Sequence, residues 1–165
     1  MWRPWGCLAV VVFVCGCSEA PRPEESPSSP FVGAWTLVET TKATSDSSWT
    51  DSSPPAGLYL FTERHFSIML IDAAESREPF PAGGASVEQR LAAYDPFIAD
   101  AGTYEFDDTT LRTQNIIAKV PNVMTAQIEH RYQIRGDSLT LAFSGAWAPP
   151  GGEITYRLVR RAERP

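Results

Sequence analysis

The stretch Phe31-Val32-Gly33-Ala34-Trp35-Thr36-Leu37-Val38-Glu39 decides the fold of this chain. Its side chains alternate between two faces, it is rich in β-branched and aromatic residues, and a glycine stands two places before a tryptophan, which predicts a β-strand. Trp35 and Leu37 point to one face, and a tryptophan is costly to leave in water. This face therefore predicts the floor of a core whose walls come from later strands. Gly33 would let a second backbone or a ring approach closely.

The N-terminal segment predicts export and a lipid anchor. Arg3 supplies a positive charge, residues 8–14 form an apolar run too short to span a bilayer, and Val14-Cys15-Gly16-Cys17 follows. This run resembles a bacterial lipobox, which implies cleavage before Cys17 and acylation of its thiol and amine. Several acyl chains on one residue suffice for stable anchoring. The alternative is an ordinary secretory signal that happens to contain cysteines.

Composition limits the function classes. The net charge of -6 argues against a nucleic-acid partner, because phosphate binding needs a basic surface. All three cysteines, Cys7, Cys15 and Cys17, lie in the N-terminal segment, so the mature domain is predicted to have no internal disulfide and no cysteine metal site. With two histidines and no cysteine in the mature domain, a three-ligand metal site would need carboxylates, and the sequence does not place any of them near one another. We therefore expect no metal and no cofactor.

Two hairpins are predicted from alternation and turn residues. Gly57–Thr62 and His65–Ile71 are strand runs separated by Glu63-Arg64, which predicts a tight hairpin. Residues 103–106 and 111–120 flank an Asp107-Asp108 turn. The alternation in 111–120 is poor, which suits a barrel wall partly lined by polar groups but also an imperfect strand assignment.

A helix is predicted between the two hairpins. Ser86-Val87-Glu88-Gln89 has the spacing of a capping box, and a helical apolar face follows, with Pro96 expected to cause a kink or an early stop. The residues of that face are Val87, Leu91, Tyr94 and Ile98. Such a helix could plug one end of a barrel.

Several of these motifs resemble the bacterial lipocalin-like domain family of the lipocalin superfamily. The matching features are Gly33-x-Trp35, the hairpin that begins Gly57-Leu58, and Gly102-Thr103-Tyr104-Glu105 directly after the helix. The family usually has Asp-Gly where this chain has Glu63-Arg64. It often carries histidines where this chain has Thr113-Gln114-Asn115, so a role that rests on those histidines is in doubt.

The fold class that follows is all-β, an eight-stranded antiparallel up-and-down barrel with one short inserted helix. The predicted organisation is a signal peptide at 1–16, an acylated Cys17 with a disordered proline-rich tether at 17–30, and the barrel domain at 31–165. Residues 42–56 are expected to form a long loop, in which Trp49 either dips into the cavity mouth or stays exposed. The resemblance implies that a basic residue on the last strand, Arg157 or Arg160, packs on Trp35.

The predicted interior of the barrel supplies the candidate ligand-binding residues. His130 faces inward by alternation, and a core histidine hydrogen-bonded to a tyrosine or carboxylate is favoured over a ligand contact. The predicted lining is Trp35, Leu37, Tyr59 or Leu60, Met69 or Ile68, His130, Tyr132 and Phe143.

Three functions remain open at this stage. The favoured one is a membrane-anchored lipoprotein that binds a small apolar ligand in its barrel. The second is an envelope interaction or structural lipoprotein with a solidly packed barrel. The third is a lipid cyclase or isomerase with Glu105, His130 or Tyr132 as acid or base, although no nucleophile elbow is present and we expect no enzyme. The expected location is the bacterial cell envelope, at the outer membrane facing the periplasm, because Ser18 rather than aspartate follows Cys17.

Overall fold

The structure is a computed structural model that describes residues 28–54, 56–73, 77–145 and 147–162. Within these ranges it contains nine strands, one α-helix and one 3-10 helix. The strands are β1 (Gly33–Ala43), β2 (Ser48–Asp51), β3 (Gly57–Phe61), β4 (His65–Ile71), β5 (Phe97–Phe106), β6 (Thr110–Ala118), β7 (Gln127–Arg135), β8 (Ser138–Ser144) and β9 (Glu153–Arg160), and the helices are α1 (Val87–Tyr94) and η1 (Pro121–Val123). The predicted signal peptide, Cys17 and the tether up to residue 27 lie outside the described residues.

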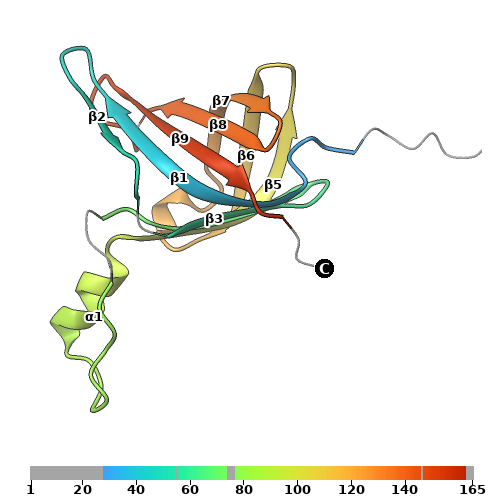
Figure 1. Ribbon diagram of the computed structural model, residues 1–165. Helices are drawn as coiled ribbons and strands as arrows, with labels where there is room; N and C mark the ends of the chain where they lie inside the picture. The colour runs from blue at the N-terminus through green and yellow to red at the C-terminus, as the bar shows by residue number, and fades with distance from the viewer. Residues whose placement is uncertain (1–27, 55, 74–76, 146, 163–165) are drawn as a thin grey trace, which may run out of the picture.

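The strands form one antiparallel sheet that closes into a barrel (Figure 1). Neighbouring strands follow the order β2-β1-β3-β4-β5-β6-β7-β8-β9, and β1 also pairs with β9. Eight strands make up the barrel, since β2 pairs only along the second half of β1, from Thr40 to Ala43. The predicted eight-stranded up-and-down barrel is thus confirmed. The long loop predicted at 42–56 is wrong in part, because its middle folds back as β2.

One end of the barrel is closed by an aromatic cluster, the plug. Phe31 lies at its centre, with its ring centroid 4.8 Å from that of Tyr132, 5.5 Å from Phe61 and 5.7 Å from Tyr104. Ser29 is also buried, and its hydroxyl lies 2.6 Å from the hydroxyl of Tyr104. The predicted tether is therefore too long at its C-terminal end, because the folded domain already includes Ser29.

Trp35 forms the floor next to the plug, as predicted. Its side chain is fully buried, and its indole Nε1 donates a hydrogen bond to the Phe31 carbonyl at 2.7 Å. The guanidinium of Arg160 lies 4.1 Å from the Trp35 ring centroid. Gly33 has a φ of 127°, and a Cβ at this position would lie 2.8 Å from Arg160 Nη1. Gly33 is thus required both by its backbone conformation and by the close approach of this cation.

The open choice between the two arginines is settled by strand register. Trp35 pairs with Arg160 across β1 and β9, which places the Arg160 guanidinium over the indole. Arg157 is three residues earlier and forms an ion pair with Glu39 at 3.0 Å instead. The cation-π partner of the tryptophan is therefore Arg160.

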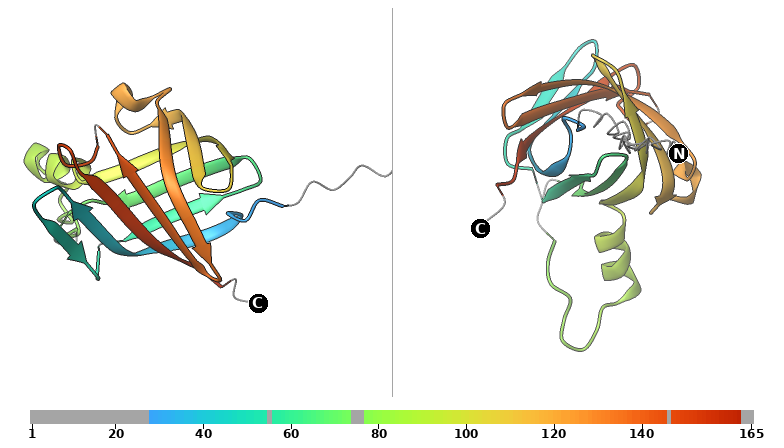
Figure 2. Two further views of the ribbon diagram at one scale, coloured as in Figure 1. Left: turned by 90° about the horizontal axis from the view of Figure 1, so that it is seen from above. Right: turned by 90° about the vertical axis from the view of Figure 1, so that its right-hand side faces the viewer.

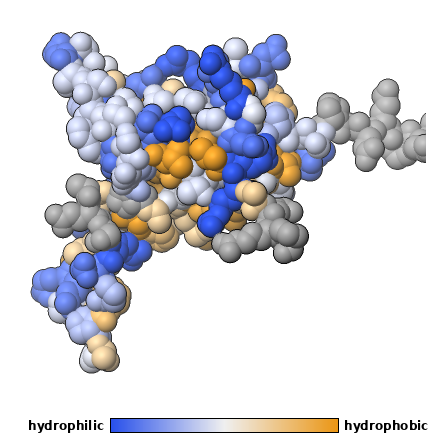
Figure 3. Space-filling model, in the orientation of Figure 1, coloured by the Kyte–Doolittle hydropathy of each residue, from blue (hydrophilic) through white to orange (hydrophobic). Residues whose placement is uncertain are grey.

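Helix α1 forms as predicted but does not plug the barrel. The Ser86 hydroxyl accepts a hydrogen bond from the Gln89 N–H at 3.2 Å, and the Gln89 side chain accepts one from the Ser86 N–H at 2.9 Å. The helix ends at Tyr94, two residues before Pro96. Residues 77–94, the arm, extend away from the barrel (Figure 1, Figure 2), and Leu91 is 52% exposed. Polar and apolar residues are mixed on the arm surface in Figure 3.

The poor alternation of β6 has a structural cause. A register shift between Ala101 and Gly102 of β5 changes the pairing with β6 near Asn115 and Ile117. Before this bulge, every second β6 residue faces inward, and two of these, Thr113 and Asn115, are polar and buried. The predicted polar wall of the barrel is therefore present on β6.

Candidate functional site

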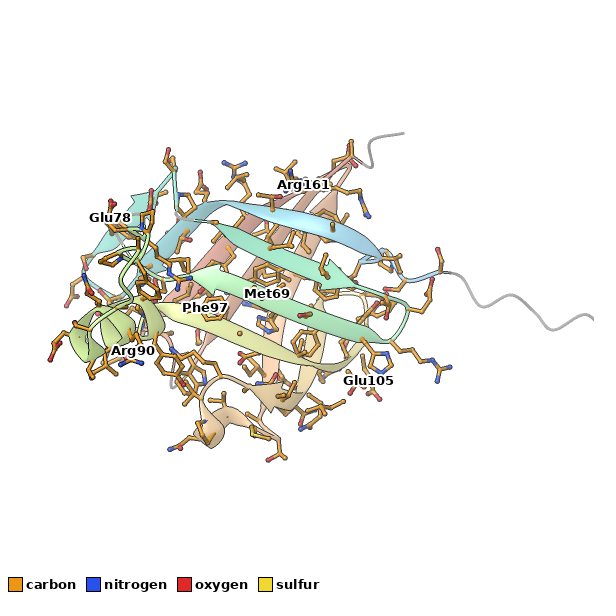
Figure 4. The ribbon with its side chains drawn as sticks, turned by 90° about the horizontal axis from the view of Figure 1, so that it is seen from below. Met69, Glu78, Arg90, Phe97, Glu105 and Arg161 are labelled. Atoms are coloured by element: carbon orange, nitrogen blue, oxygen red, sulfur yellow. The ribbon has the colours of Figure 1, made fainter. Side chains whose placement is uncertain are left out.

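The barrel encloses a cavity of about 280 Å³ at the end opposite the plug. Its exposed lining residues include Asp95, Val120 and Trp147, which mark the mouth. Figure 4 shows β5 running from Phe97 beside the arm to Glu105 at the other end of the barrel. The mouth thus lies on the arm side, and the chain enters the fold at the closed end.

Most of the cavity wall is apolar. The apolar and aromatic lining residues are Phe66, Ile68, Leu70, Phe97, Ile98, Ala99, Val120, Val123, Ile128, Phe143, Trp147 and Ile154. Tyr59 and Tyr156 also line it, with ring centroids 6.2 Å apart, and burial raises the pKa of both hydroxyls. Both tyrosines are therefore neutral at neutral pH and present a hydrogen-bonding hydroxyl inside an apolar cavity.

His130 lines the cavity and is 6% exposed. Its Nε2 lies 3.5 Å from the Thr113 hydroxyl, its ring packs edge-on against Phe143 at 5.3 Å, and its Nδ1 has no hydrogen-bond partner among the described residues. Burial lowers the pKa of His130 from 6.5 to about 4, so the imidazole is neutral at pH 7. Among the described residues no tyrosine or carboxylate forms a hydrogen bond with its ring, and the predicted hydrogen bond of that kind is wrong.

Asp100 places a carboxyl group in the same cavity. Its neighbours across the sheet are Ile68 on β4 and Ala118 on β6, and Ile68 in turn lies beside Tyr59 on β3. Residues opposite one another in a sheet point to the same face, so Asp100 shares the interior with Ile68. Burial raises the pKa of its half-buried carboxyl group.

The structure places the predicted ligand-binding residues in three groups. His130 and Phe143 line the cavity, and ligand contact by either one stays a prediction. Trp35, Leu37 and Tyr132 belong to the packed core or lie against it, outside the cavity lining. For Met69 the structure corrects the expectation.

Met69 is 39% exposed on the outer face of β4, where Figure 4 labels it. The residue before it, Ile68, lines the cavity. Of the other two alternatives, Tyr59 and Leu60, Tyr59 lines the cavity. Trp49 lies exposed on β2 and is not part of the lining. His65, at the start of β4, is also exposed.

Sequence reasoning missed Asp100 as a cavity residue. The predicted helix was extended through Ile98, whereas β5 already begins at Phe97. The signal that was present is the alternation of Ile98, Asp100 and Gly102 on one face after Pro96, which continues directly into the predicted strand at Thr103.

Two further findings concern the described part of the chain. No group of three or more histidine, cysteine, aspartate or glutamate side chains is placed to hold a metal ion there. No helix within the described ranges has the length and apolar character needed to cross a bilayer.

Comparisons with known proteins give a family. Residues 32–158 match the family described as a lipocalin-like domain, which covers most of the chain. No curated protein matches. Among solved structures, a lipocalin-like protein from Bacteroides uniformis has 12% identity and a TM-score of 0.45 over 79% of this chain and 98% of that one. An uncharacterized protein from Bacteroides eggerthii has 11% identity and a TM-score of 0.44 over 79% and 99%. From the match over residues 32–158, the chain belongs to the lipocalin-like domain family.

Proposed function

We propose that this lipocalin-like protein binds one small, mostly apolar molecule inside its barrel. The observation that carries the proposal is the cavity of about 280 Å³, which is open at one end and has a largely apolar wall with a few polar groups. Ligand sites in proteins share these properties, and their volumes begin at roughly 300 Å³. Binding would be driven by removing apolar surface from water.

The cavity volume limits the size of the ligand. An engineered apolar cavity of about 150 Å³ accommodates benzene, with its six carbon atoms. By proportion, a volume of about 280 Å³ suits roughly eleven non-hydrogen atoms. This size favours a compact one-ring or two-ring molecule or a medium-length aliphatic chain over a complete phospholipid.

The packed-barrel alternative is less well supported. Phe31 and its aromatic neighbours fill only the closed end of the barrel, and the other end keeps an open volume lined by Tyr59, Ile68 and His130. The cyclase or isomerase alternative stays a prediction.

Membrane anchoring through acylated Cys17 is part of the proposal. The support is the lipobox resemblance of Val14–Cys17 and the polar, proline-rich composition that follows it. Residues 18–27, if extended, span at most about 35 Å. Because Ser29 packs beside the plug, such a tether would leave from the closed end, and the mouth would be free to face away from the anchor.

Native mass spectrometry of the full chain, extracted from its membrane in mild detergent, tests ligand binding. We expect a discrete added mass of a small molecule. Ile68→Trp would fill the cavity and abolish that mass, whereas Met69→Trp, on the outer face of the same strand, would retain it. Thermal unfolding confirms that both variants fold. A bare polypeptide for the unsubstituted chain, also after addition of a lipid extract, would overturn the proposal.

A further inference from the structure

The cavity has carboxylates but no available cation. Its lining includes Asp72, Asp95 and Asp100, and Lys119 is the one lysine or arginine among the lining residues that the structure describes. The Lys119 ammonium donates hydrogen bonds to the Tyr94 carbonyl at 2.6 Å and the Asp95 carbonyl at 3.0 Å. It also lies 4.1 Å from the centroid of the Tyr94 ring. Lys119 is therefore engaged in holding the end of α1.

Of the three carboxylates, Asp100 is the one that lies inside the barrel. Asp72 is paired with Lys42 at 2.8 Å, and Asp95 is exposed at the mouth. Asp100 is half-buried and lies across the sheet from Ile68, which in turn lies across from Tyr59. Among the described residues Asp100 has no ion pair. A carboxylate in an apolar cavity is costly unless a cation or a hydrogen-bond donor approaches it.

His130 does not balance this charge. The imidazole is neutral at pH 7, and its Nδ1 has no hydrogen-bond partner in the part of the chain that the structure describes. The Thr113 hydroxyl has a single hydrogen and lies 3.4 Å from the Ile128 carbonyl, which can accept it. Thr113 would then accept from His130 Nε2 and leave Nδ1 as a bare acceptor. The interior thus presents acceptors without a charged donor.

We propose that the ligand carries a hydrogen-bond-donating group, an ammonium or a hydroxyl, that pairs with Asp100 inside the barrel, and that carboxylate ligands such as fatty acids are disfavoured. The inference rests on the proposed ligand binding and adds the chemical class of the ligand. An ammonium group would form a charge-assisted hydrogen bond with Asp100, which is stronger than a neutral one. A fatty acid would bring a second negative charge near Asp100 without a cation to compensate it.

Four naphthalene derivatives of about the right size test the inference by calorimetric titration of the full chain. Naphthylmethylamine carries a cationic donor, naphthol a neutral donor, methoxynaphthalene no donor, and naphthoate an anion. We expect the amine or naphthol to bind at least about tenfold more tightly than methoxynaphthalene, and naphthoate to bind most weakly. A preference for the amine identifies an ammonium ligand, and a preference for naphthol identifies a neutral one.

Asp100→Asn should lower the affinity for the preferred donor about tenfold and leave methoxynaphthalene binding unchanged. Asp108→Asn removes the same charge from an exposed turn at the closed end and serves as the matched control. Naphthoate binding as tight as that of the donors, or equal effects of the two substitutions, would overturn the inference while leaving a ligand-binding barrel. Failure of all four compounds to bind would instead count against the proposed function itself.

Discussion

His130 is expected to make the protein lose stability in mild acid. The imidazole is buried and neutral, and its pKa falls from 6.5 to about 4. Between these two pH values the unfolded chain binds a proton at His130 and the folded chain does not, so stability is complete above pH 6.5 and declines as the pH falls toward 4. The full loss is about 3 kcal/mol, because one pH unit corresponds to about 1.4 kcal/mol.

Urea unfolding of the wild type and of His130→Gln, followed by fluorescence at about pH 7 and about pH 5, measures this term. The wild type should lose about 2 kcal/mol more than the variant over this interval, since Gln does not titrate. Asp100 acts in the opposite direction, because its pKa is raised by burial and its protonation favours the folded state. That contribution is common to both proteins and cancels. Equal pH dependence of the two proteins would refute the account of His130 as a buried, neutral base.

Three other substitutions test the packing. Gly33→Ala should cost about 2 kcal/mol in urea unfolding, because the new Cβ meets Arg160 and the φ of 127° strains any other residue. Tyr104→Phe should cost about 1–3 kcal/mol, because the Tyr104 hydroxyl lies 2.6 Å from both the Ser29 hydroxyl and a backbone carbonyl. Leu91→Ser should change stability by less than about 0.5 kcal/mol in the same assay, because α1 has no buried residue.

Two of these substitutions have a matched control. Gly84→Ala has a positive φ of 95° but open space around the new Cβ, so it isolates the backbone strain from the clash. Tyr94→Phe removes an exposed hydroxyl that donates to the Lys119 carbonyl at 3.2 Å and should be nearly neutral. A loss of more than 1 kcal/mol from the exposed leucine change would show that the arm packs on something and contradict its exposed position.

The sequence predicted most accurately the elements that depend on neighbouring residues. The predicted strand at His65–Ile71 has the bounds of β4, because a run of apolar and aromatic residues that follows a tight turn is a local pattern. The capping box from Ser86 to Gln89 likewise depends on four consecutive residues, and it is present as predicted.

Register could not be predicted in the same way. The choice between Arg157 and Arg160 depends on how β9 aligns with β1, and the pairing shifts between Leu37 and Glu39. A bulge changes which residues face each other without leaving a clear mark in the sequence. The prediction that α1 plugs one end of the barrel was wrong for a related reason. An apolar stripe indicates which face of a helix seeks cover, but it does not specify a partner within the chain.

The barrel separates stability from binding along its length. The plug and Trp35 supply close packing at one end, where Phe31 is fully buried among aromatic rings. At the other end, burial disfavours the charged form of Asp100, and the buried His130 Nδ1 has no hydrogen-bond partner among the described residues, so each group reduces the stability of the empty protein. A fold tolerates such groups where they serve a site and where packing elsewhere offsets their cost. Apolar replacement of His130 should therefore stabilise the empty barrel, and replacement of plug residues should not.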